Sequence, residues 1–380
     1  MDIVCFCHLR WDFVYQRPQH ILSRIAEYCR IFFIEEPIYD SDTNFLDTSN
    51  KETNIWIIQP HLQTGLSSAE VSEEQVRLLK DLFSFFKVKE AIAWYYTPMA
   101  LSLKASFEPK LIVFDCMDEL SAFKYAPPEL IQREKELLKL ADIVFTGGYS
   151  LYQAKKNRHP NIHLFPSSID RKHFNKARSI GKDHIDQQNI SHPRIGFFGV
   201  IDERMDIRLL NDIALERPGW NFIFIGPIVK IDPATLPSYS NIYYLGPKPY
   251  KELPEYIAGW DVAIMPFAMN ESTRYISPTK TPEYLAAGKP VVSTPIHDVV
   301  KTYAKDGLVS IAGNTNDFIN ALQRCIEMQH NDGWLKRVDE YLEKDSWDLT
   351  CEKMMQHINT ALFTEGKPNN VPRQKEDYYV

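Results

Sequence analysis

Apolar and polar positions along the chain alternate with a period that changes several times. Short apolar runs at residues 3–7, 31–35 and 91–95 have the length of buried parallel strands. Between them, residues 72–86 place apolar side chains at helical spacing. This succession predicts an α/β protein in which a parallel sheet is connected by right-handed crossovers.

A polar stretch divides this pattern into two parts. Residues 176–193 contain few side chains suited to a core, and the strand pattern restarts at residues 194–198. We therefore predict that a linker, 176–193, joins a first domain, 1–175, to a second domain, 194–345. Residues 365–380 are polar and contain two prolines, so we expect a flexible tail there.

The bulk composition narrows the classes of function. The 380 residues carry a formal net charge of −7, which argues against nucleic-acid binding because such proteins normally present a basic face. The six cysteines form no Cys-x-x-Cys pair and are expected to be reduced and mostly buried. No secretory signal or membrane span is visible, so we expect a cytoplasmic protein, with peripheral contact at the inner face of the membrane left open.

The stretch at residues 277–294 reads as a loop, a short helix, a glycine stop and a buried strand. Ser277 or Thr279 is suited to cap the helix, and Gly288 stands where a left-handed residue ends one. The free amides of the helix start, with Lys280 beside them, would suit a phosphate. Glu283, about one turn further on, would accept hydrogen bonds from sugar hydroxyls. An ordinary capped helix beside a strand fits the local pattern equally well.

Residues 283–292, Glu-Tyr-Leu-Ala-Ala-Gly-Lys-Pro-Val-Val, resemble the C-terminal motif of retaining GT-B glycosyltransferases, in particular glycosyltransferase family 4. The resemblance implies two Rossmann-like domains that face each other across a cleft. It also implies that the last helix, at about 346–364, crosses back to the first domain. The nucleotide-sugar donor would lie on the second domain and the acceptor on the first.

The resemblance also implies roles for residues of the second domain. Glu283 would hold the ribose of the donor, and Ser277, Thr279 and Lys280 would lie at the diphosphate and sugar end. Tyr275 stands where the family usually carries a Glu that contacts the sugar, and the nearest upstream carboxylate, Glu271, is four residues out of register. The candidate residues of the loops that meet the diphosphate and the nucleobase are Gly199, Arg204, Lys248 and Tyr250.

Two of the charged candidates have plain structural alternatives. Arg204 is the best cation for neutralising the diphosphate, but it could instead pair with a neighbouring carboxylate such as Asp202. Asp118 follows a predicted strand near the place where many relatives carry a His that touches the donor sugar. It is a candidate for polar contact or acid/base help, and equally for capping the next helix.

The loop after the first strand is the predicted acceptor pocket. It contains His8, Arg10, Trp11 and Arg17, and we expect the two arginines to be free to engage a phosphate or carboxylate. The alternative is a solvated loop whose aromatic residues pack on the domain edge. Asp40-Ser41-Asp42 is read as a solvated turn, so no metal site is predicted.

These observations and the resemblance together predict a metal-independent hexosyltransferase that moves a sugar from a UDP- or GDP-sugar to a hydroxyl acceptor, such as a sugar or glycolipid. The resemblance implies retention at the anomeric carbon and a role in glycan or surface-polysaccharide biosynthesis. No other cofactor is expected, and the absence of a GxGxxG motif argues against a nicotinamide or flavin enzyme. Two alternatives stay open. One is another GT-B sugar enzyme, such as an epimerase or phosphorylase, and the other is a non-catalytic scaffold that binds a nucleotide or sugar.

Overall fold

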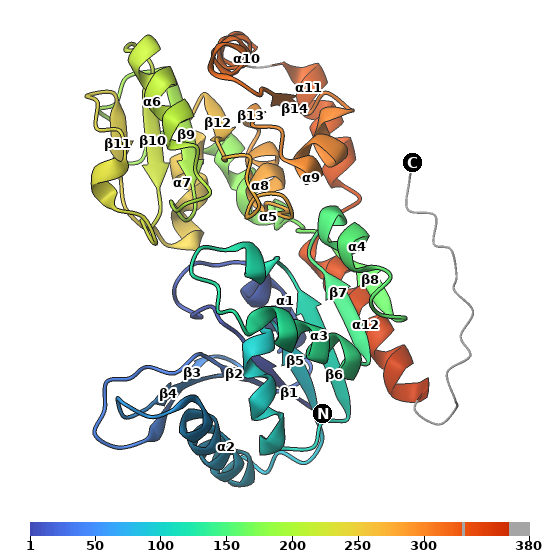
Figure 1. The fold of residues 1–380 in the computed structure, drawn as a ribbon. Coiled ribbons are helices and arrows are strands. Elements are labelled where there is room, and N and C mark those ends of the chain that lie inside the picture. Colours follow the sequence, from blue (N-terminus) through green and yellow to red (C-terminus); the bar gives the residue numbers. More distant parts are fainter. Residues whose placement is uncertain (329–330, 365–380) are drawn as a thin grey trace.

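The computed structural model describes residues 1–328 and 331–364, and the predicted tail, 365–380, lies outside them. Two sheets organise the chain (Figure 1). The first has the strand order β3-β4-β2-β1-β5-β6-β7-β8 and is parallel except for β3. Its strands are β1 (Asp2–Phe6), β2 (Ile31–Ile34), β3 (Phe45–Glu52), β4 (Ile55–His61), β5 (Ala91–Tyr95), β6 (Leu111–Cys116), β7 (Ile143–Thr146) and β8 (Ile162–Leu164).

The second sheet is parallel throughout and has the order β11-β10-β9-β12-β13-β14. Its strands are β9 (Arg194–Phe198), β10 (Asn221–Ile225), β11 (Ile242–Tyr244), β12 (Val262–Met265), β13 (Val291–Ser293) and β14 (Val309–Ile311). We call the residues packed on the first sheet the first domain and those packed on the second sheet the second domain. The predicted α/β architecture with two parallel-sheet domains is confirmed.

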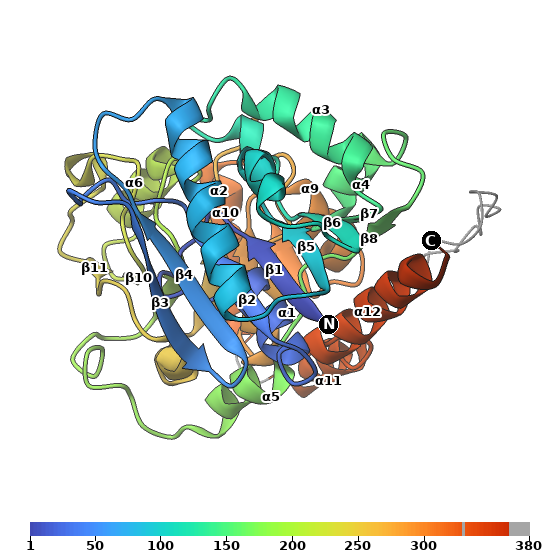
Figure 2. The ribbon, with the colours of Figure 1, turned by 90° about the horizontal axis from the view of Figure 1, so that it is seen from below.

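Helices pack on the sheets (Figures 1 and 2), and those expected at residues 72–86 and at about 346–364 are among them. Those of the first domain are α1 (Arg17–Ile25), α2 (Ser68–Phe85), α3 (Leu130–Leu140) and α4 (Tyr149–Lys155). The short helix α5 (Arg171–Phe174) follows, and its Phe174 is buried in the core of the second domain. Those of the second half are α6 (Ile207–Glu216), α7 (Leu253–Ala258), α8 (Lys280–Ala286), α9 (His297–Val299), α10 (Thr315–Glu327), α11 (Asp332–Leu342) and α12 (Trp347–Thr364). Among the described residues, no helix combines the length and apolarity that a bilayer span requires.

The last helix belongs to the core of the first domain. Trp347, Met354 and Ile358 of α12 are fully buried in the same apolar cluster as Ile21 and Leu22 of α1. Figure 1 shows α12 running from the second domain down along the first sheet. The predicted return of the C-terminal helix to the first domain is therefore confirmed.

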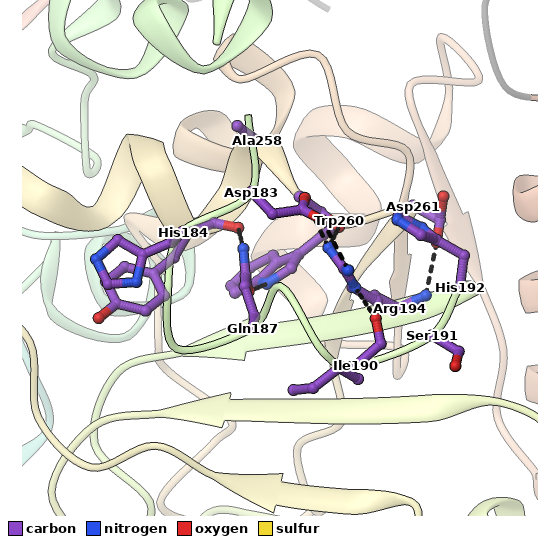
Figure 3. Close-up of polar contacts among 12 residues, drawn as sticks. Asp183, His184, Gln187, Ile190, Ser191, His192, Arg194, Ala258, Trp260 and Asp261 are labelled. Atoms are coloured by element: carbon purple, nitrogen blue, oxygen red, sulfur yellow. Dashed lines mark hydrogen bonds and ion pairs between the residues drawn. The ribbon is translucent and has the colours of Figure 1, made fainter. Parts of the chain in front are cut away.

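The segment before β9 packs on the second domain rather than lying free in solvent (Figure 3). The Gln187 side chain is fully buried, donates to the backbone oxygen of Tyr256 at 2.7 Å and accepts from the Trp260 indole N–H. Arg194 at the start of β9 pairs with Asp183 at 2.8 Å. Polar side chains thus anchor a stretch that its composition alone presented as a linker.

Candidate donor site between the two sheets

The loop after β9 and the start of α8 meet at Gly199 and Lys280. The backbone of Gly199 has a φ of +128°, and a Cβ built there would lie 2.1 Å from Lys280 Cε. The Lys280 ammonium lies 5.8 Å from the ring centre of Phe197. Burial lowers the pKa of Lys280 to about 8, and the nearby Arg204 charge acts in the same direction. The absence of a side chain at Gly199 therefore leaves room for the Lys280 side chain next to the end of β9.

Glu283, one turn along α8, is a buried carboxylate with an unused oxygen. Its side chain is 3% exposed, and Oε2 has no hydrogen-bond partner among the described residues. Burial raises the pKa of Glu283 to about 8, although the Lys280 charge opposes the rise. The Oγ1 of Thr281 and the hydroxyl of Tyr250 are likewise buried without a partner in the described chain. Such groups normally signal a ligand or water that completes the bonds.

Arg204 forms an ion pair with Asp202, which the sequence offered as the alternative to a phosphate role. Its guanidinium donates to both carboxylate oxygens of Asp202, with the shortest contact 2.7 Å, and lies 5.3 Å from the Phe123 ring centre of the first domain. Burial raises the pKa of Asp118 to about 6, and the Arg204 charge opposes this rise more than any other neighbour. Arg204 of the second domain therefore lies against the first domain, near enough for its charge to act on Asp118.

The predicted capping of α8 is wrong. Thr279 is the N-cap residue but its side chain makes no capping hydrogen bond, because its φ and ψ of −61° and −29° are already helical rather than extended. The Ser277 hydroxyl instead accepts from the backbone N–H of Ser167 at 3.4 Å, and the Ser277 backbone oxygen accepts from the Ser167 hydroxyl at 2.5 Å. The loop before α8 is therefore held by hydrogen bonds to Ser167 of the first domain, and not by a helix cap. Gly288 does end the helix with a positive φ of +76°, as predicted.

Other donor candidates lie around this centre with partners of their own. Lys248 pairs with Asp186 at 2.6 Å. Tyr275 packs against an apolar cluster of the first domain and lies under the Arg274 guanidinium, while Glu271 is exposed.

Tyr250 is sandwiched between side chains from other parts of the chain. Its ring stacks on Tyr15 of the first domain at 4.4 Å and on His173 at 4.5 Å. The loops of the two domains therefore touch at the predicted nucleobase end.

The predicted acceptor arginines are not free, which corrects that expectation. Arg17 is 3% exposed and donates to both Asp115 oxygens and to the backbone oxygen of Phe165. Arg10 pairs with Glu35 at 3.1 Å. Both carboxylates are buried, and a buried charge requires a partner. Arg17 therefore stabilises the first domain from within, whereas Arg10, with a side chain 37% exposed, does so at the surface.

The other two residues of the predicted acceptor loop behave differently from each other. Trp11 is 7% exposed and packs edge-on against Phe33 at 5.1 Å, as the structural alternative for this loop anticipated. His8 keeps a buried Nδ1 without a partner among the described residues. Burial lowers the pKa of His8 to about 4, and the charge of Lys230 from the second domain adds to this. His8 is thus a neutral polar group at the domain boundary.

Comparison with known proteins gives this geometry a context. Residues 192–328 match the family model described as Glycosyl transferases group 1. A Bacillus subtilis (strain 168) protein named as a teichuronic acid biosynthesis glycosyltransferase is 22% identical over 284 residues, which is 70% of each chain. Sucrose-phosphate synthase from Thermosynechococcus elongatus superposes with a TM-score of 0.70 at 15% identity, covering 95% of this chain and 99% of the other.

This chain has the GT-B fold. Two further GT-B structures cover almost the whole chain. An α,α-trehalose-phosphate synthase (UDP-forming) from Burkholderia xenovorans, in complex with glucose-6-phosphate, has a TM-score of 0.68 at 11% identity and covers 94% of this chain and 99% of its own. A trehalose-6-phosphate protein from E. coli bound with UDP-2-fluoro glucose has a TM-score of 0.65 at 14% identity, covering 98% and 100%. The resemblance to glycosyl transferases group 1 is confirmed by the family match in the GT-B second domain, and the findings together support a glycosyltransferase.

Proposed function

We propose that the protein transfers a hexosyl group from a nucleoside-diphosphate sugar to a hydroxyl acceptor, with retention at the anomeric carbon and without a metal ion, as expected for glycosyltransferase family 4. The observation that carries the proposal is that Lys280 and Glu283 lie one turn apart on α8, near the Arg204 charge, and that Glu283 Oε2 has no hydrogen-bond partner among the described residues. The donor would lie on the second domain, 194–345, and the acceptor on the first, 1–175 together with the helix returning at 346–364. Residues 176–193 would join them.

The chemistry of the donor explains the need for cations. When the bond to the diphosphate breaks, negative charge grows on the leaving group while the anomeric carbon becomes positive. Lys280 and Arg204 would stabilise the leaving diphosphate, and they would do so more strongly than cations in open water because both are partly buried. The family-based expectation that the leaving phosphate takes the acceptor proton means that no dedicated protein base is required.

The carboxylates have separate proposed roles. Glu283 would accept hydrogen bonds from the ribose hydroxyls, which would satisfy its unused oxygen. Asp118, whose pKa is raised to about 6 by burial, would contact the sugar near the reacting carbon. Ser277, Thr279 and Gly199 would line the diphosphate and sugar end, while Lys248 and Tyr250 would border the nucleobase. Tyr275 would lie at the sugar end in place of the usual Glu.

Three observations support the rest of the proposal. The superposed E. coli structure holds UDP-2-fluoro glucose, which favours a UDP-sugar over a GDP-sugar. The superposed Burkholderia xenovorans structure holds glucose-6-phosphate, which favours a sugar or sugar-phosphate acceptor near His8. The Bacillus subtilis relative is assigned to teichuronic acid biosynthesis, which favours a role in surface polysaccharides. A cytoplasmic enzyme working at the inner face of the membrane would fit that role.

The proposal is tested by a panel of UDP-, GDP- and ADP-sugars, first by thermal shift and then by turnover, with and without a chelator. We expect one donor to stabilise the protein, to be consumed in the presence of a hydroxyl acceptor, and to react equally well in the chelator. NMR of the product should show the donor's anomeric configuration. A donor that stabilises the protein but is neither transferred nor slowly hydrolysed would instead support a non-catalytic binder.

The mechanism is tested by Lys280→Ala, which should lower kcat on the order of 100-fold or more because the leaving group loses a buried cation. Lys336→Ala is the matched control, since that lysine lies on α11 of the same domain with a side chain 78% exposed. Wild-type kcat in a folded Lys280→Ala protein would remove Lys280 from the mechanism.

A further inference from the structure

A carboxylate of the second domain accepts a hydrogen bond from a backbone N–H in the first turn of a helix of the first domain. Asp298 of α9 is 4% exposed and accepts from the backbone N–H of Ser150 in α4 at 3.1 Å. It also accepts a hydrogen bond from the Ser150 hydroxyl. The first amides of a helix have no partner within it, and here the partner comes from the other domain. In Figure 1, α9 lies directly above α4.

Gly148, just before α4, leaves the space for this contact. Its φ of −170° is ordinary extended backbone, so conformational freedom is not the reason for a glycine. A Cβ built at Gly148 would lie 2.5 Å from the Asp298 carboxylate and 2.8 Å from the Ser277 Cβ. Any side chain at this position would therefore push the second domain away from the first.

The contact continues on both sides of Asp298. The ring of Tyr149 stacks on His297 with centroids 6.1 Å apart, and the Lys301 ammonium lies 3.4 Å from the centre of the Tyr149 ring. These contacts lie at the exposed rim of the buried Asp298 carboxylate, since the His297 side chain is 61% exposed and Lys301, just after α9, is exposed as well. We call residues 148–150 with 297–301 the interdomain joint.

The joint lies beside the segment that leads to Lys280. Ser277 is bounded by Gly148 and is held twice by Ser167 of the first domain, through its hydroxyl and its backbone oxygen. Lys280 follows three residues later and begins α8. The first domain therefore holds the segment that carries the proposed diphosphate cation.

We propose that Asp298 is a positioning residue for the donor: the joint keeps the two domains closed and thereby sets the place of the 277–280 segment before the donor binds. This inference rests on the proposed function, and it gives the first domain a part in donor binding besides the acceptor. Loss of the joint would lower the fraction of molecules that is competent to bind. Apparent donor affinity would fall by that fraction, while a saturating donor would restore closure.

The experiment compares Asp298→Ala, Asp298→Asn and Gly148→Ala with the control Asn314→Ala. Asn314 caps α10 by accepting from the Asp317 N–H at 3.0 Å, so the control also loses a helix cap, but outside the joint. We expect Asp298→Ala to raise the donor KM about 10-fold, since a hydrogen bond to a charged group is lost, with kcat nearly unchanged. Asn keeps an acceptor oxygen and should recover most of the loss. Gly148→Ala should raise the donor KM although the carboxylate is intact.

A second readout does not depend on catalysis. Small-angle X-ray scattering of the ligand-free protein should show a larger radius of gyration for Asp298→Ala and Gly148→Ala than for the wild type and Asn314→Ala. Amide exchange at Ser150 should also be faster in Asp298→Ala. If no nucleotide sugar reacts at all, the proposed function fails, and the scattering curves still decide whether the joint holds the domains. A wild-type scattering curve and a wild-type donor KM in folded Asp298→Ala and Gly148→Ala proteins would overturn the inference.

Discussion

Gly199→Ala displaces Lys280 without removing any charge. An added Cβ would lie 2.1 Å from Lys280 Cε and 2.7 Å from Nζ. Carbon atoms in contact ordinarily lie about 3.5–4.0 Å apart, so the lysine would have to move by roughly 1.5 Å. A misplacement of about 1 Å at a reacting centre can cost on the order of 100-fold in rate. We therefore expect kcat/KM for the donor to fall by that factor.

The control for Gly199→Ala is Gly307→Ala. Gly307 also has a positive φ, +63°, but a Cβ there would meet no heavy atom within 4 Å. Both variants introduce backbone strain and should melt at lower temperatures than the wild type. Only Gly199→Ala should lose turnover, measured as initial rates over a range of donor concentrations. A folded Gly199→Ala protein with wild-type kcat/KM would refute the proposed placement of Lys280.

Two predictions follow from the pKa values of the buried pair. Because the pKa of Lys280 is lowered to about 8, the affinity for a nucleoside diphosphate should fall as the pH rises above about 8 and the lysine loses its charge. Titration calorimetry from pH 6.5 to 9.5 would measure this. An affinity that does not change with pH would exclude Lys280 as the phosphate cation. Glu283→Gln should raise the melting temperature but weaken nucleotide binding. The folded carboxyl has a raised pKa and so binds more protons than the unfolded one between its ordinary value of 4.5 and about 8. Wild-type stability is therefore reduced as the pH rises through this range, and the advantage of Gln should grow from pH 5 to pH 8; an advantage independent of pH would contradict this.

The strands and helices that form the cores were predictable because burial leaves a periodic signal. The apolar run before residue 198 and the Gly-Lys-Pro sequence after α8 marked β9 and β13 correctly. β3 (Phe45–Glu52) escaped prediction because it is an edge strand with mostly exposed side chains, so no apolar run marks it. β8 (Ile162–Leu164) escaped as well, since its three residues are only partly buried.

The site was only partly predictable, because local sequence does not record contacts between distant segments. The motif around α8 predicted Lys280 and Glu283 as site residues. Because Asp202 is only two residues from Arg204, an ion pair between them could be predicted as the alternative to a phosphate role for Arg204. Nothing near Asp298 indicates that it bonds to Ser150, which is 148 residues away. The Arg17–Asp115 pair spans 98 residues, so nothing in the local sequence showed that Arg17 is already paired, and the prediction that it is free was wrong.

The Arg204–Asp202 pair is compatible with a phosphate role for Arg204. Asp202 is 4% exposed and also accepts from the backbone N–H of Arg204 at 3.0 Å, so the carboxylate is fixed by the loop itself. A guanidinium has five N–H donors, and Asp202 is contacted through the Nε and Nη2 atoms. The pair therefore orients the guanidinium before a ligand arrives, which lowers the reorganisation needed in the reaction. Arg204 is balanced by Asp202, whereas Lys280 has no ion pair within the described part of the chain, so the proposed mechanism depends most on Lys280.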